Sequence, residues 1–331
     1  MSNLLGSLMS FFSRKPPQPK PPADNFTEPA QIMNSKVLVI VYDPVMDPAT
    51  GRTLSQHQNW YRPADLITAF MADLLQSSGG MARYQLVQRV DLNEFPAKTD
   101  GFRYNPQTYL DVIRGAASPH MPQEVNYHAI LSKHNVLARV ARNEFDEVWV
   151  FGFPHAGFYE SIMAGPGAFW CNAPPLKNTD ASKRRFVIMG FSYERFIGEM
   201  HEAYGHRTES ILEKTFSKLP ADSNLWKRFS RYEKIAAGKA ACGNIHFAPN
   251  SQQDYDWNNA TVVQSECYDW KLNFPNFKGD IRQVDASEWG NGEIRAHHTW
   301  WFKHIPKVAG RKNGVHNNWW QYIVDPNRVL L

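Results

Sequence analysis

Two histidines and a glutamate lie close together in the sequence at His201, Glu202 and His206, within a segment whose pattern predicts a helix. Neutral imidazole nitrogens are preferred ligands of zinc, and a neighbouring carboxylate can take a proton from metal-bound water. These residue types therefore predict a metal-dependent hydrolase, with zinc or another divalent metal as cofactor. In this arrangement His201 and His206 would bind the metal and Glu202 would act as the catalytic base.

The spacing of this segment leaves other interpretations open. The two histidines are five positions apart in the sequence, so an ideal helix places them about 140° apart around its axis. Glu202, His206 and Glu209 instead follow one stripe of the helix, at positions i, i+4 and i+7. They could bind a metal without His201, or act as an acid–base cluster. A solvated helix face, on which these side chains pair with one another and with Arg207, is the third interpretation.

Polar residues outside the helix are candidates for the same site. His155, Tyr159 and Glu160 follow a predicted buried strand in a glycine-containing loop, which continues to Trp170. Asp43 follows the first predicted strand. Because ligands of parallel sheets bind at the carboxyl ends of the strands, Glu160 is a second candidate for the catalytic base and the other four are candidate substrate contacts. A tight structural turn around His155 is the alternative.

A later segment offers a further metal ligand. His246 lies between apolar and aromatic neighbours and could complete the metal site, with Asn250 as a nearby substrate contact. A lone histidine is also frequently a hydrogen-bonded core residue, so both interpretations stand.

The pattern His201-Glu202-x-x-x-His206 resembles the HExxxH helix of zinc peptidases of the dipeptidyl-peptidase III type. The resemblance covers this helix alone. It implies His201 and His206 as ligands, Glu202 as general base, and a further glutamate ligand on a later helix. Two other segments, 146–152 and 163–169, resemble an uncharacterised family of bacterial proteins, which implies a shared fold and no particular activity.

Apolar runs and helical periodicity alternate along the first two thirds of the chain. Runs rich in β-branched and aromatic residues predict strands buried on both faces, and spaced apolar residues predict helices between them. The alternation predicts an α/β fold, mainly a parallel sheet flanked by helices. The predicted strands are 36–42, 84–90, 147–153 and 185–191, and the predicted helices are 63–76, 127–141 and 193–216.

Composition divides the chain into three parts: a flexible proline-rich tail over residues 1–33, an α/β domain over 34–220, and a tryptophan-rich, loop-rich region over 221–331 packed on it. Eight of the eleven tryptophans lie in the last part. Beside Asn, Asp and His they could stack on sugars, or they could fill the core of a loop-rich region.

The net charge of +4 over 331 residues is too small for a nucleic-acid-binding surface, so no nucleic-acid partner is expected. No apolar run reaches the length of a membrane span, and we expect a soluble protein. The apolar stretch 4–12, followed by Arg14 and Lys15, lacks the charge order of a signal peptide, but could give weak membrane association. With three cysteines, one disulfide between Cys242 and Cys267 is possible, and reduced thiols are equally possible, so the cellular location is not decided.

The sequence thus predicts a metal-dependent hydrolase acting on a peptide or a glycan-containing substrate. The first alternative is a non-catalytic carbohydrate-binding or surface protein, which requires exposed tryptophans. An assembly component tethered by residues 1–33 is the second alternative. The sequence does not decide the oligomeric state.

Overall fold

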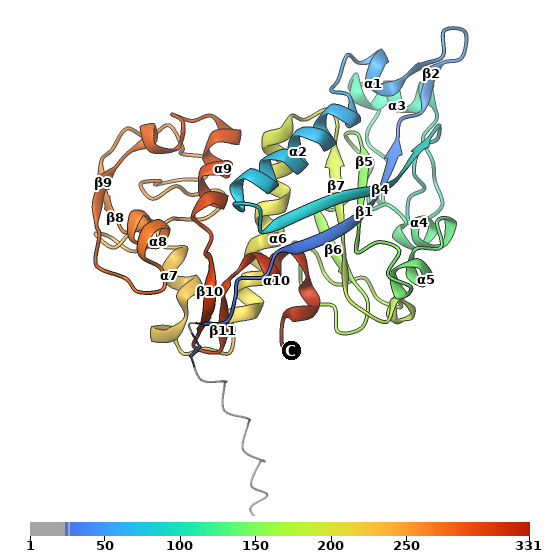
Figure 1. Cartoon of the computed structure of the whole chain (residues 1–331). Coiled ribbons are helices and arrows are strands. Elements are labelled where there is room, and N and C mark those ends of the chain that lie inside the picture. The colour runs from blue at the N-terminus through green and yellow to red at the C-terminus, as the bar shows by residue number, and fades with distance from the viewer. Residues whose placement is uncertain (1–23, 26) are drawn as a thin grey trace, which may run out of the picture.

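The computed structural model describes residues 24–25 and 27–331, and a five-stranded sheet forms its centre (Figure 1). Four neighbouring strands are parallel, and the edge strand β6 runs antiparallel to β7. The predicted α/β class with a mainly parallel sheet is confirmed. In spatial order the strands are β4 (Ala82–Leu92), β1 (Met33–Tyr42), β5 (Glu147–Gly152), β7 (Phe186–Ser192) and β6 (Ser161–Ala164).

Helices lie on both sides of the sheet (Figure 1). Helices α2 (Pro63–Ser77) and α6 (Ile197–Phe216) pack against each other on one side, and α4 (Tyr127–Lys133) and α5 (Val136–Ala141) lie on the other. The helix predicted over 127–141 is two helices, because Asn135 adopts a left-handed backbone (φ 51°) that ends the first one. Helix α6 begins at Ile197, four residues later than predicted.

A buried ion pair fixes α6 to the centre of the sheet. Arg207 is fully buried, and its guanidinium lies 2.6 Å from a carboxylate oxygen of Glu147 on β5. Arg207 also donates to the carbonyl of Ile323, and Trp149 Nε1 donates to Glu147 at 2.7 Å. Breaking one partner of such a buried pair costs about 3–5 kcal/mol. The helix that carries the candidate metal ligands is therefore held in one position on the sheet.

The region after residue 220 packs against α6, and its helices α9 and α10 make the contact. All eight of its tryptophans are buried, the most exposed being Trp300 at 7%. They pack edge-to-face or tilted against one another and against phenylalanines, so they form a core and present no open face to solvent. The elements here are α7 (Leu225–Phe229), α8 (Cys267–Asn273), α9 (Ile294–His304), α10 (Trp320–Val324), and two antiparallel strand pairs, β8 (Val263–Ser265) with β9 (Arg282–Val284) and β10 (Lys307–Lys312) with β11 (Val315–Asn318).

Short elements complete the described chain. A pair of short antiparallel strands follows β1, and short helices and 3₁₀ turns join the larger elements. They are β2 (Val45–Asp47), β3 (Arg52–Thr53), α1 (Leu54–His57), α3 (Pro106–Ile113) and the 3₁₀ turns η1 (Asp180–Ser182), η2 (Ala221–Ser223), η3 (Ala286–Trp289) and η4 (Pro326–Arg328).

Most of the predicted N-terminal tail, residues 1–23 and 26, lies outside the described residues, and so does the segment considered for membrane association. The remainder of the tail contacts the β10–β11 hairpin, where Glu28 pairs with Arg311 and Asn318 donates to the carbonyl of Gln31. Among the described helices, none combines the length and the apolar character that a membrane crossing requires. Cys242 and Cys267 are buried free thiols.

Candidate metal centre

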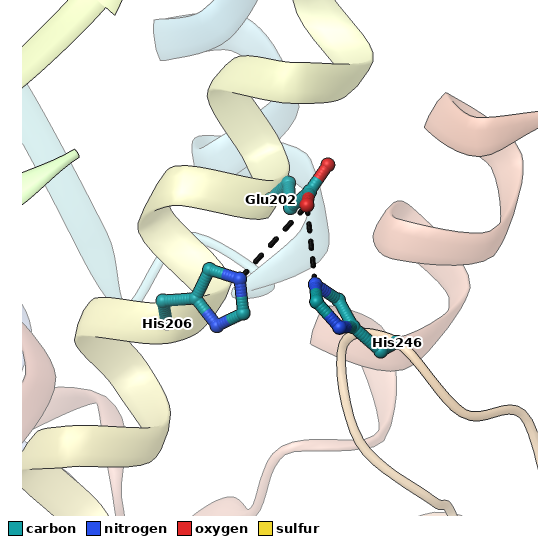
Figure 2. A group of neighbouring side chains, drawn as sticks. All are labelled: Glu202, His206 and His246. Atoms are coloured by element: carbon teal, nitrogen blue, oxygen red, sulfur yellow. Dashed lines mark hydrogen bonds and ion pairs between the residues drawn. The ribbon is translucent and has the colours of Figure 1, made fainter. Parts of the chain in front are cut away.

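Glu202, His206 and His246 converge on one point beside α6 (Figure 2). One possible ligand atom from each residue lies within 4.8 Å of the other two. Glu202 Oε1 is 3.1 Å from His246 Nε2 and 3.9 Å from His206 Nε2. Figure 2 shows that Glu202 and His206 come from successive turns of α6, whereas His246 comes from a separate loop.

The spacing of these atoms suits a four-coordinate metal. Zinc binds histidine nitrogen and carboxylate oxygen at about 2.0–2.2 Å, so two ligand atoms of a tetrahedron lie about 3.3–3.6 Å apart. The measured separations of 3.1 and 3.9 Å fall on either side of this range. All three atoms lie within 4.8 Å of one another, so modest side-chain movements would bring them around one ion. A histidine pair with one carboxylate is also a common ligand set of catalytic zinc.

Each histidine has a carboxylate at its outer ring nitrogen. Glu209 Oε2 lies 3.1 Å from His206 Nδ1, and Asp254 Oδ1 lies 3.4 Å from His246 Nδ1. A carboxylate at this position holds the proton on Nδ1, which leaves Nε2 free to bind a metal and fixes the ring orientation. Both imidazoles are thus oriented with Nε2 toward Glu202, as metal ligands would be.

The loop that carries His246 reaches α6 because residue 205 is a glycine. A Cβ atom at Gly205 would lie 2.3 Å from the Ile245 side chain, far inside contact distance. The backbone N–H of Ile245 also donates to Glu209 Oε1 at 3.0 Å. One carboxylate therefore orients His206 and holds the loop of His246. Gly205 and Glu209 thus join the helix α6 part of the cluster to the loop that carries His246.

Glu160 also lies near His206 Nε2. Its Oε2 is 3.9 Å from His206 Nε2 and accepts a hydrogen bond from Asn172 at 2.6 Å. Gly190 on β7 allows this position, because a Cβ there would lie 2.3 Å from the carbonyl oxygen of Tyr159. Gly190 N–H donates to the carbonyl of Glu160 at 3.0 Å. The loop after β5 is thereby pressed onto the sheet and turns Glu160 toward the cluster.

Tyr255 completes the set of side chains around Glu202. Its hydroxyl donates to Glu202 Oε1 at 2.9 Å and lies 3.3 Å from His246 Nε2. Burial, together with the hydrogen bond to Glu202, raises the pKa of Tyr255 to about 12. The hydroxyl therefore keeps its proton near neutral pH.

The charges of the cluster favour a cation. Burial raises the pKa of Glu202, but the contacts with His246 and Tyr255 outweigh it and bring the pKa to about 2. Burial lowers the pKa of His206, but nearby carboxylates, Glu209 first, outweigh it and leave the pKa raised. Four carboxylates surround two imidazoles, so the centre carries excess negative charge that a divalent cation would neutralise.

A cavity of about 450 Å³ opens at the carboxyl ends of β5 and β7 and reaches Glu160. A second, more open hollow is bordered by Glu202 and Tyr255. Glu194, Arg195 and Glu199 line both, so the two spaces meet at the start of α6. Substrate would have access to the cluster from this edge of the sheet, which is where the strand order predicts ligands to bind.

His201 lies apart from the cluster. It is fully buried between Phe70 and Phe302, and its Nε2 is 3.2 Å from Asp73 on α2. Arg295 on α9 pairs with the same carboxylate at 2.8 Å. Burial lowers the pKa of His201, which keeps the ring neutral. The five-residue spacing thus separates the two histidines on the helix, and His201 joins α6 to α2 and α9.

Two predicted substrate contacts have their hydrogen-bonding groups occupied within the fold. Asp43 accepts from the backbone and hydroxyl of Ser55 at 2.8 and 2.7 Å. Asn250 is fully buried and donates to the carbonyls of Asn259 and Thr261. Both side chains hold loops in place.

Three predicted substrate contacts lie nearer to open space. His155 lines the cavity in a left-handed conformation (φ 65°), with its carbonyl held by Lys98 Nζ. Tyr159 stacks on Tyr127 and is 37% exposed, and Trp170 is 58% exposed. These three side chains are free to contact a bound molecule.

Asp254 and Tyr255 were not among the residues predicted from the sequence. Both stand in a polar loop without periodicity, at a place where Asp, Tyr and Trp alternate. Their contact with His246 arises from the path of the loop, and a backbone hydrogen bond from Tyr255 N–H to the carbonyl of His246 (3.2 Å) secures it. No spacing rule would have selected them.

Comparison of the chain with protein-family models, with curated proteins and with solved structures finds no match.

Proposed function

We propose that this protein is a metal-dependent hydrolase, with zinc or another divalent transition metal bound by Glu202, His206 and His246. One observation carries the proposal: two histidines direct Nε2 toward one carboxylate oxygen while their Nδ1 atoms face further carboxylates. Metal-binding histidines show this orientation, because a carboxylate at Nδ1 holds the ring proton there and leaves Nε2 for the metal.

The surrounding groups support hydrolysis. A metal in a site of this kind lowers the pKa of bound water and polarises a carbonyl or glycosidic oxygen. Glu160, 3.9 Å from His206 Nε2, is close enough to accept a proton from a water at the metal. Three protein ligands leave a position for that water, as catalytic sites do. Glu160 is therefore the proposed general base and Glu202 a proposed ligand.

The proposed substrate is a peptide or a glycan-containing molecule. The cavity at Glu160 and the hollow at Tyr255 meet beside the cluster, so an extended substrate could pass the metal with a part on either side. Exposed aromatic rings, among them Tyr61 and Phe196, border the second hollow. Binding of carbohydrate through the tryptophan-rich region receives no support, because all eight tryptophans are buried.

The first experiment is elemental analysis of protein purified without a histidine tag. We expect about one equivalent of zinc or another divalent metal per chain, and its loss in His206→Ala. His128→Ala is the matched control, because His128 is an exposed histidine on α4 and should leave the metal content unchanged. Absence of metal from the wild type, even after supplementation, would overturn the proposal.

Activity is tested on the metal-loaded protein with panels of peptides and of oligosaccharides. We expect hydrolysis that a chelator abolishes and that added metal restores. Glu160→Gln should keep the metal but lose most of the rate, because general acid–base groups contribute about 10²–10⁴-fold. A metal-loaded protein with unchanged turnover in Glu160→Gln would remove Glu160 from the proposed role.

A further inference from the structure

The Tyr255 hydroxyl stands at a corner of the metal centre. It lies 2.9 Å from Glu202 Oε1 and 3.3 Å from His246 Nε2, both close to the 3.3–3.6 Å expected between ligand atoms of a tetrahedral metal at about 2.0–2.2 Å. The hydroxyl therefore lies within reach of an ion held by Glu202 and His246.

The backbone at Tyr255 is held in an unusual conformation. Its φ of +59° lies in the left-handed region, which residues with a side chain seldom adopt. Such conformations persist where the surroundings impose them, and they concentrate at functional sites. Here the hydrogen bond to the His246 carbonyl and the contact with Glu202 impose it.

Tyr255 is nevertheless easy to displace. Half of the residue, 51%, is exposed, and its loop contains further exposed residues on the N-terminal side. The side chain borders the open hollow beside Glu202, so it can turn away without disturbing the core. A side chain that reaches the metal position but is weakly held by the fold can act as a ligand that binds reversibly.

We propose that Tyr255 is a displaceable fourth ligand of the metal centre, which closes the site at rest and leaves its position to the metal-bound water when substrate binds. On binding, the phenol oxygen forms a bond to the metal and its proton passes to solvent; on departure the phenol is reprotonated and the position opens. This inference rests on the proposed metal site and adds its regulation. Glu160 lies beside His206.

The test uses the full-length protein loaded with Cu²⁺, because a phenolate bound to copper gives a charge-transfer band in the visible spectrum. Wild type and Tyr255→Phe are compared for copper content, for this band, and for affinity toward azide, a small anion that needs an open position. Tyr268→Phe is the matched control. Its hydroxyl also donates to a glutamate, Glu288, at 2.8 Å, in a different part of the fold.

We expect one copper in all three proteins, and a charge-transfer band in wild type and Tyr268→Phe that Tyr255→Phe lacks. Azide should bind Tyr255→Phe about tenfold more tightly, if the phenolate fills the position about nine-tenths of the time. Equal copper content with the same spectrum and azide affinity in wild type and Tyr255→Phe would overturn the role of Tyr255 alone. No copper in any of the three would overturn the metal site itself.

Discussion

Glu209→Gln tests whether the outer carboxylates prepare the site for metal. One oxygen of Glu209 faces His206 Nδ1 at 3.1 Å, and the other accepts from Ile245 N–H at 3.0 Å. A glutamine has one acceptor oxygen, so its NH₂ group would face one of these two donors. Either His206 loses its orienting partner or the loop of His246 loses its anchor. Both changes weaken the same metal site.

The expected loss is tenfold to hundredfold in metal affinity, which corresponds to about 1.4–2.7 kcal/mol. Competition with a chromophoric zinc chelator measures it directly. Stability gives a second measurement: metal at 100 times the wild-type Kd stabilises the folded state by about 2.7 kcal/mol, but a variant with hundredfold weaker binding gains only about 0.4 kcal/mol. Urea unfolding with and without zinc would show this difference.

Glu213→Gln is the control for Glu209→Gln. Glu213 lies four residues further along α6 and is exposed. Its substitution by glutamine changes the net charge by the same amount as Glu209→Gln. We expect its zinc affinity to equal that of the wild type. The reasoning is refuted if Glu209→Gln binds zinc within twofold of the wild type, since the carboxylate would then have no orienting role.

Two further predictions concern the fold around the site. Burial lowers the pKa of His298 and His304 to about 3, against 6.5 in the unfolded chain, so stability is present above pH 6.5 and falls below it. The loss at pH 5 is about 2 kcal/mol per histidine, and equal urea midpoints at pH 7.5 and pH 5 would contradict it. Burial raises the pKa of Asp73, but the contacts with His201 and Arg295 outweigh it and lower the pKa from 3.8 to about 2. The ionised Asp73 therefore stabilises the folded state above pH 3.8, and this stabilisation is lost as the pH falls toward 2. Asp73→Asn should cost about 2 kcal/mol in urea unfolding at neutral pH, and a fully stable variant would rule out this bracing.

The predicted strands and helices of the α/β part agree with the structure because burial on both faces leaves a clear pattern. Strand β5 is an unbroken apolar run apart from Glu147 and Gly152, and every residue in it is buried. Short or irregular elements leave no such pattern. Strand β6 has four residues within what was interpreted as a loop, and it forms only because β7 offers a free edge.

The helix stripe Glu202, His206 and Glu209 follows from spacing, and the structure brings these three side chains together. The spacing also separates His201 from His206, as the helix geometry requires. His246 was a candidate ligand on its residue type alone. Its position beside His206 depends on the close approach at Gly205, to which no local pattern points.

Periodicity and residue type, both local properties, determined the fold class, the site helix and the nature of the ligands. Tertiary structure decided which ligands meet. It turned His201 into the core beside Asp73, buried the tryptophans, and brought the segment with His246, Asp254 and Tyr255 to Glu202 on α6. The physical reason is that helical spacing fixes the direction of a side chain relative to its neighbours on the helix. Contact across more than 40 residues depends on how loops pack, and packing is a property of the whole chain.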